Sequence, residues 1–150
     1  MNRLRKLARL PWRVRLMTIE AAAWLLLVAL AVQCLPFRWI VARCTTVIVG
    51  ADAPAPGVFD RALVAQVSGA VQRAARHLPF KLLCLPQALA AKAMLHRRGI
   101  ASTLHLGMAV ADGNRRRLQA HAWLTVGDVG VVGMGASRGF TRLAGFGNEP

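Results

Sequence analysis

Two residues of this chain, Cys84 and His121, have the types and the setting that a thiol nucleophile and its base require. Cys84 comes just before an Ala- and Leu-rich stretch, so we expect its sulfur at the amino terminus of a helix. There the positive end of the helix dipole favours a thiolate, and unbonded N–H groups can stabilise an oxyanion. A histidine on a strand packed against this helix could act as general base. Each residue alone is a weak signal, because free cysteine is commonly a small buried apolar residue. Together they indicate a thiol hydrolase.

Two helices are predicted around the cysteine. Apolar residues recur at spacings of three and four over residues 59–77, which is typical of a helix with one buried face. A second helix is expected from Cys84 to about Arg98, with Pro86 in its first turn and Gly99 as its cap. Cys84 would then lie at the start of this second helix.

After Gly99 the apolar period changes to two, which predicts strands. We expect strands over residues 100–110, 118–126 and 129–132. One face of the middle strand would carry Gln119, His121, Trp123 and Thr125. The Gly-rich remainder of the chain carries no clear pattern. Helices followed by an antiparallel meander define an α+β fold.

The composition excludes several kinds of enzyme. Twenty Lys and Arg stand against six Asp and Glu, for a net charge of +14. So few carboxylates argue against a carboxylate-dyad hydrolase and against a calcium or magnesium site. The three cysteines, Cys34, Cys44 and Cys84, lack the paired spacing of a zinc site or a disulfide framework. We therefore expect a reducing, cytoplasmic compartment, a free thiol, and no metal or cofactor.

The amino-terminal third is basic and then apolar. The first fifteen residues carry six positive charges and no acid, and an apolar run of twelve residues follows from Ala21 to Val32. A membrane span needs about 20 apolar residues, which is more than this run contains. In a signal peptide the basic stretch leads directly into the apolar stretch, whereas here the acid Glu20 stands between the two. We therefore favour a buried or surface-lying helix over a span or a signal. The arginines then form a solvated face, or they attract anionic lipid or an acidic peptide.

A boundary is predicted after this segment. Leu35-Pro36 should end the apolar helix, and a second short helix is expected over residues 37–49. The Pro- and Gly-rich run 50–57 is typical of a loop. The chain would then consist of a basic and then hydrophobic helical segment, 1–49, and a core, 58–150.

The other sulfur and imidazole groups are weaker candidates for chemistry. Cys34 and Cys44 lie in apolar or Arg-flanked helical sequence and are expected to be buried thiols. His105 alternates with leucines on a strand and is interpreted as structural. His77 and His96 lie beside arginines near helix ends and are expected at the surface.

Four stretches of the chain together resemble a known family. In order, they read RAARHLP at 73–79, CLPQALA at 84–90, LHRRGIASTLHLG at 95–107 and QAHAWL at 119–124. This set resembles the lasso-peptide biosynthesis B protein, and more narrowly its leader-peptidase half. That half is similar to the microcin-processing and transglutaminase-like cysteine proteases. The resemblance implies a papain- or transglutaminase-like core over residues 58–150.

Proteolysis is the activity that this resemblance implies. Such proteins remove the leader from a ribosomally made precursor, so that a partner cyclase can join the freed amine to a side-chain carboxylate. By this match Cys84 is the nucleophile, and His121 is the general base and acid.

The chain departs from the family's pattern at the third catalytic residue. The family has an Asp after the His-Ala-Trp strand, and the matching position, twelve after His121, is Gly133. A hairpin turning at Gly127-Asp128 would likewise put an orienting group near Gly133, Met134 or Gly135, none of which is acidic.

Neither Asp128 nor Asp112, the two acids closest in sequence to His121, is expected to take the place of this missing Asp. Asp128 would lie at the turn itself, roughly 20 Å along the strand from His121. Asp112, at the tip of the first predicted hairpin, is no better supported. Either a backbone carbonyl or a side chain from elsewhere orients the imidazole, or catalysis is weakened. A Cys–His pair can still work without a strong orienting group, because a thiolate is intrinsically nucleophilic.

The resemblance also predicts partners. Some family members carry a leader-binding module ahead of the peptidase, and the helical residues before Gly50 leave no room for one. We therefore expect the precursor peptide, a separate leader-binding protein and the lactam-forming cyclase as partners, with contact to a membrane surface also possible. Nucleic acid is not expected, because the chain has no Tyr and no stacking or helix-turn-helix motif. The cytoplasmic peptidase could lie peripherally on the inner membrane. The alternative function is a non-catalytic, basic, membrane-associated protein.

Overall fold

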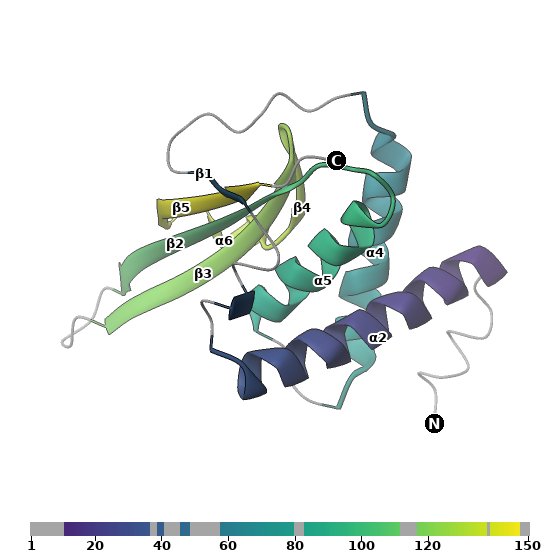
Figure 1. Cartoon of the computed structure of the whole chain (residues 1–150), viewed down its shortest axis with the longest axis horizontal. Helices are drawn as coiled ribbons and strands as arrows, with labels where there is room; N and C mark the ends of the chain where they lie inside the picture. The colour runs from purple at the N-terminus through teal and green to yellow at the C-terminus, as the bar shows by residue number, and fades with distance from the viewer. Residues whose placement is uncertain are drawn as a thin grey trace.

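The computed structural model describes residues 11–36, 39–40, 46–48, 58–79, 83–111, 117–137 and 139–147, and every structural statement below concerns these residues. Three long helices precede the main part of an antiparallel sheet, as expected for an α+β fold (Figure 1). The elements in chain order are α2 (Trp12–Cys34), β1 (Thr46–Ile48), α4 (Arg61–His77), α5 (Cys84–His96), β2 (Thr103–Ala111), β3 (Arg117–Val126), β4 (Val129–Val132), α6 (Met134–Ser137) and β5 (Thr141–Gly147).

The sheet has five strands in the order β1-β5-β2-β3-β4, and every neighbouring pair is antiparallel. Strands β2 and β3 form a hairpin in which Gly107 lies opposite His121. Strand β5 pairs with β2 on one side and with β1 on the other. The last strand of the chain is therefore interior to the sheet.

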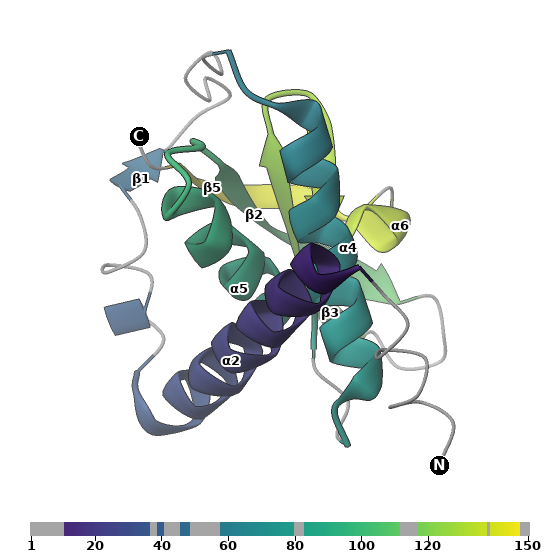
Figure 2. The ribbon, with the colours of Figure 1, turned by 90° about the vertical axis from the view of Figure 1, so that its right-hand side faces the viewer.

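Helix α5 lies in the middle of a layered arrangement. It contacts β2, β3 and β4 on one side and α2 and α4 on the other, and α2 lies on the side of α4 and α5 away from the sheet (Figures 1 and 2). Because both sides of α5 are covered, the helix is apolar almost all round. Large side chains from all three layers are fully buried in one core, including Leu25, Val67, Val71, Met94, Leu95, Leu104 and Leu124. Burial of each such side chain stabilises the fold by roughly 1.5–3 kcal/mol.

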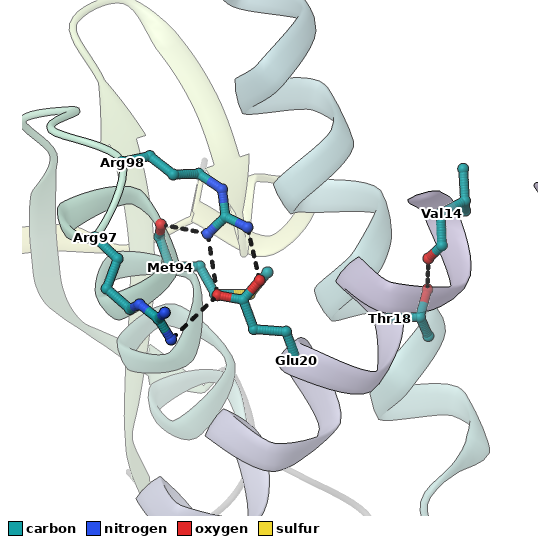
Figure 3. A network of polar contacts seen from close by, with 6 residues as sticks. All are labelled: Val14, Thr18, Glu20, Met94, Arg97 and Arg98. Atoms are coloured by element: carbon teal, nitrogen blue, oxygen red, sulfur yellow. Dashed lines mark hydrogen bonds and ion pairs between the residues drawn. The ribbon is translucent and has the colours of Figure 1, made fainter. Parts of the chain in front are cut away.

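An ion pair joins α2 to the end of α5. The guanidinium of Arg98 donates to both carboxylate oxygens of Glu20, at 3.1 and 2.6 Å, and also to the Met94 carbonyl oxygen at 2.8 Å (Figure 3). Arg97 lies 3.7 Å from the same carboxylate. The hydrogen bond from Arg98, followed by the positive charge of both arginines, lowers the pKa of Glu20, against the opposing effect of its partial burial. Helix α2 is therefore attached to the core by charge as well as by packing.

A second contact attaches α2 to α4. Thr18 is buried, donates to the Val14 carbonyl oxygen at 2.7 Å (Figure 3), and accepts from Arg73 Nε at 3.4 Å. Ala21 and Leu25 follow on the same face and are fully buried. This face of α2 is part of the core.

The three predicted long helices and the three predicted strands are confirmed to within a few residues. The short helix predicted over residues 37–49 is wrong at Thr46–Ile48, which form β1. Their β-branched side chains favour an extended backbone, and β5 supplies the strand to pair with. The division between residues 49 and 58 stays a prediction.

Candidate active site

Cys84 is the first residue of α5, as the sequence predicts. Leu83 precedes the helix and offers no side-chain acceptor to its first turn, and Pro86 has no N–H. The N–H groups of Cys84 and Leu85 lie in the first turn of α5, where the helix itself provides no carbonyl partner for them. The side chain of Cys84 is half-buried.

The sulfur of Cys84 contacts the strand that carries the candidate base. The backbone N–H of Ala122 donates to Cys84 Sγ at an N···S distance of 3.4 Å. Ala122 directly follows His121 on β3. Helix α5 packs against β3, so Cys84 lies beside the residue that follows the candidate base in the chain.

The imidazole of His121 is held by a main-chain atom. Its Nε2 lies 2.7 Å from the carbonyl oxygen of Gly133. A carbonyl oxygen only accepts, so Nε2 carries the hydrogen. In the neutral ring, Nδ1 is then the nitrogen that can take a proton. Gly133 lies within the short stretch in which the sequence predicts an orienting group, and that group is a backbone carbonyl.

The backbone at Gly133 explains why no acid stands there. Its φ is +83°, a conformation that residues with a Cβ rarely adopt. A Cβ at this position would lie 2.6 Å from the Ala122 carbonyl oxygen and 3.1 Å from Trp123 Cα. Any side chain is excluded in this conformation, an aspartate included. The aspartate that the sequence resemblance leads one to expect here therefore does not fit this backbone, and the Gly133 carbonyl oxygen contacts the imidazole instead.

Two aromatic rings flank the imidazole of His121. Phe140 lies at a centroid distance of 5.0 Å and Trp123 at 6.0 Å. The position of the Trp123 indole requires a glycine at position 107 on the neighbouring strand, because a Cβ added there would lie 2.8 Å from the ring. These two ring contacts restrict rotation of the imidazole.

His105 is a structural residue, as the sequence suggests. It is buried, its ring stacks on Trp123 at 5.4 Å, and its Nε2 lies 2.9 Å from Thr125 Oγ1. Burial, and secondarily the charges of Arg142 and Lys92, lower the pKa of His105 to about 4. The ring is therefore neutral at physiological pH and packs against the same indole, that of Trp123, as His121 does.

Three further residues lie away from this cluster. His77 and His96 are exposed, as predicted, and His77 Nδ1 is bonded to the Arg73 carbonyl oxygen at 2.7 Å. Asp128 lies at the second turn, where it pairs with Arg61 at 3.5 Å in solvent.

One prediction about the cysteines is wrong. Cys34 is exposed rather than buried. It lies four residues after Leu30 on the face of α2 that points away from the core, so helical periodicity carries it into solvent. The predictions for Cys44 and Asp112 concern residues outside the described part of the chain.

Two parts of the site could not be identified from the sequence. Phe140 lies in the Gly-rich stretch for which no pattern was recognised, and a lone aromatic residue among glycines was the only signal. The Ala122 N–H is a backbone group, so no residue type marks it. Within the described ranges, no group of three or more His, Cys, Asp or Glu could hold a metal ion.

Comparison with known proteins yields one match. A family described as the Transglutaminase-like superfamily matches residues 24–145, which begins within α2 and ends within β5. No curated protein and no solved structure matches the chain.

Proposed function

Because the chain belongs to the transglutaminase-like superfamily, which includes cysteine proteases, we propose that it is a cysteine peptidase. Cys84 is the nucleophile and His121 the general base and acid. The observation that carries the proposal is the hydrogen bond between the Ala122 N–H and Cys84 Sγ. Through this bond the thiol, at the amino terminus of α5, contacts the residue that follows His121 on β3. The Nε2 atom of His121 is bonded to the Gly133 carbonyl oxygen, which leaves Nδ1 as the nitrogen that could accept the thiol proton.

The chemistry follows from these groups. The Cys84 thiol gives its proton to Nδ1 of His121, and the thiolate attacks the scissile carbonyl carbon. The oxyanion is stabilised by N–H groups in the first turn of α5. His121 then returns the proton to the leaving amine, and water hydrolyses the thioester to release the new carboxylate and the thiol. Throughout the cycle, the Gly133 carbonyl accepts from Nε2–H and stabilises the imidazolium when it forms.

The substrate that we propose is the leader of a lasso-peptide precursor. Four ordered sequence stretches support this assignment, and they span both candidate catalytic residues. The net charge of +14 suits a chain that grips an acidic leader or an acidic partner. In this proposal a separate small protein binds the leader, and a cyclase then consumes the freed amine.

Reconstitution tests the peptidase. The full chain is incubated with the precursor and the leader-binding protein encoded nearby, and the products are identified by mass spectrometry. Cys84→Ala is expected to lose cleavage by a factor of at least about 10³, because no nucleophile remains. Cys34→Ala is the matched control, since this exposed thiol lies on α2 and should leave the rate unchanged. Cleavage at the normal rate by Cys84→Ala would refute the proposal.

One observation favours a second candidate, a non-catalytic basic protein associated with a membrane. Within the described ranges, α2 is the one helix long and apolar enough to cross a membrane, although core helices and signal sequences meet the same criterion. Absence of cleavage by the wild-type chain in the reconstituted system, together with retention in the membrane fraction, would favour this candidate.

A further inference from the structure

Helix α2 carries a continuous row of exposed apolar side chains along the face that points away from α4 and α5. We call this row the α2 stripe; its members are Trp12, Leu16, Ile19, Leu26, Leu27 and Leu30. Their spacings of three, four and seven residues put them on one side of the helix. Ile19 and Leu30 are 64% and 62% exposed, values unusual for aliphatic side chains in water. A row of this length on one face indicates a binding surface.

The opposite face of α2 is attached to the core and limits how the stripe can be covered. Glu20 is bonded to Arg98 and Thr18 to Arg73. If α2 crossed a bilayer in this state, it would draw α4, α5 and their charged side chains into the hydrocarbon, where unsatisfied polar groups and charges are very costly. The attachment therefore favours an arrangement in which α2 lies along a surface with only its stripe inserted.

The charges around the stripe identify the chemistry of that surface. On a helix with 100° per residue, Arg13 and Arg15 project on either side of the line from Trp12 to Leu16, and both are exposed. Residues 1–11, which precede α2 in the sequence, contain four further Lys and Arg residues. Glu20 is the sole acid among the first 51 residues, and it is engaged by Arg98. Apolar side chains with cations on both flanks complement a bilayer that presents anionic headgroups.

We propose that the α2 stripe docks this protein on the surface of an anionic lipid bilayer. The helix lies parallel to the membrane plane, its apolar side chains enter the headgroup region, and its arginines contact lipid phosphates. The sheet lies on the other side of α4 and α5 (Figure 2), so His121 and the face that would receive a peptide stay in water. This docking is independent of the proposed peptidase activity.

Vesicle flotation tests the docking with the full-length chain. Vesicles of phosphatidylglycerol and phosphatidylcholine are compared with vesicles of phosphatidylcholine alone. We expect strong binding to the first, at least tenfold weaker binding to the second, and release from the first in 0.5 M NaCl, where salt screens surface charges.

Two pairs of substitutions locate the binding surface. Ile19→Gln with Leu30→Gln removes two exposed aliphatic side chains from the stripe and leaves the buried face of α2 intact. Each aliphatic side chain taken from water strengthens binding by roughly tenfold, so this double variant should lose roughly a hundredfold in partition coefficient. Val58→Gln with Leu143→Gln is the matched control, because it removes two exposed apolar side chains outside α2. It should bind as the wild type does.

Four results would overturn the proposal. One is equal binding to the neutral and anionic vesicles, and another is unchanged binding of the Ile19/Leu30 variant. A third is a doubled mass of the lipid-free chain in light scattering that this variant restores to a monomer, since the stripe would then bind a second copy. The fourth is resistance to extraction by alkaline carbonate, since α2 would then cross the bilayer. Circular dichroism and urea unfolding establish that each variant is folded.

Discussion

Replacing Gly133 by alanine tests the assignment of a backbone carbonyl as the group that orients His121. The new Cβ would lie 2.6 Å from the Ala122 carbonyl oxygen, and ordinary contact begins at 3.4 Å. The clash with a backbone atom cannot be relieved by a side-chain rotation, so the segment around Gly133 must move by most of an ångström. A movement of this size stretches the bond from His121 Nε2, now 2.7 Å, towards the limit of hydrogen bonding at about 3.5 Å.

The expected cost has two parts. The positive φ and the overpacking should together lower the free energy of unfolding by about 2–4 kcal/mol. Loosening of the imidazole should lower kcat/KM per folded molecule by roughly 100-fold with little change in KM, since misplacement of a catalytic group by about 1 Å costs that much. Urea unfolding gives the first quantity. Cleavage of the precursor, corrected for the folded fraction, gives the second.

Gly135→Ala is the matched control. An added Cβ there has no neighbour within 4 Å, and its φ is not positive. It should change stability by less than about 0.5 kcal/mol and leave the rate unchanged. Nitrogen-15 NMR of His121 adds a readout that stability alone does not move, because the wild type should show the Nε2–H tautomer. If Gly133→Ala retained both this tautomer and the full rate, the carbonyl would have no positioning role.

Two further predictions concern stability. Glu20→Gln should lower the free energy of unfolding by about 1–2 kcal/mol, because the Glu20 side chain is only 24% exposed and its ion pair is shielded from water. Asp128→Asn should change the free energy of unfolding by less than about 0.5 kcal/mol, because the Asp128 side chain is 76% exposed. Equal effects in urea unfolding would show that the attachment of α2 does not depend on this ion pair. The chain should also lose stability as the pH falls from about 6.5 towards 4, because the unfolded state protonates His105 near 6.5 while the folded state resists it to about 4. This loss should approach about 3 kcal/mol and should be absent in His105→Gln. The same dependence of stability on pH in that variant would assign the loss to other groups. Glu20 is one such group, because its lowered pKa makes stability fall as the pH drops below the ordinary value of 4.5.

Local sequence signals were sufficient for most of the helical part of the fold. The start of α5 at Cys84 follows from Pro86 and the Ala- and Leu-rich stretch, and the end of α2 follows from Leu35-Pro36. The β2–β3 hairpin follows from alternation of apolar residues. These features depend on nearby residues, which is why single-chain reasoning reached them.

Features that depend on distant residues were missed. Strand β5 is Gly-rich and carries little alternation, and it is a strand because β2 and β1 provide partners on both its edges. Thr46–Ile48 were assigned to a helix for the same reason, since their partner lies about a hundred residues later in the chain. At the site, the sequence indicated that an orienting group was needed near residues 133–135, and it left open a backbone carbonyl there or a side chain from elsewhere. It could not distinguish a carbonyl from a side chain, because the φ of Gly133 is set by packing against β3.

The position of β5 has a consequence for how the protein is made. A nascent chain leaves the ribosome amino terminus first, so the three long helices and the β2–β3 hairpin emerge before β5 is synthesised. Until then, one edge of β2 has unpaired backbone groups that can template pairing with another nascent chain. Closure of the sheet is thus a late, non-local event. The interval before it is when this protein is most exposed to aggregation and most dependent on chaperones.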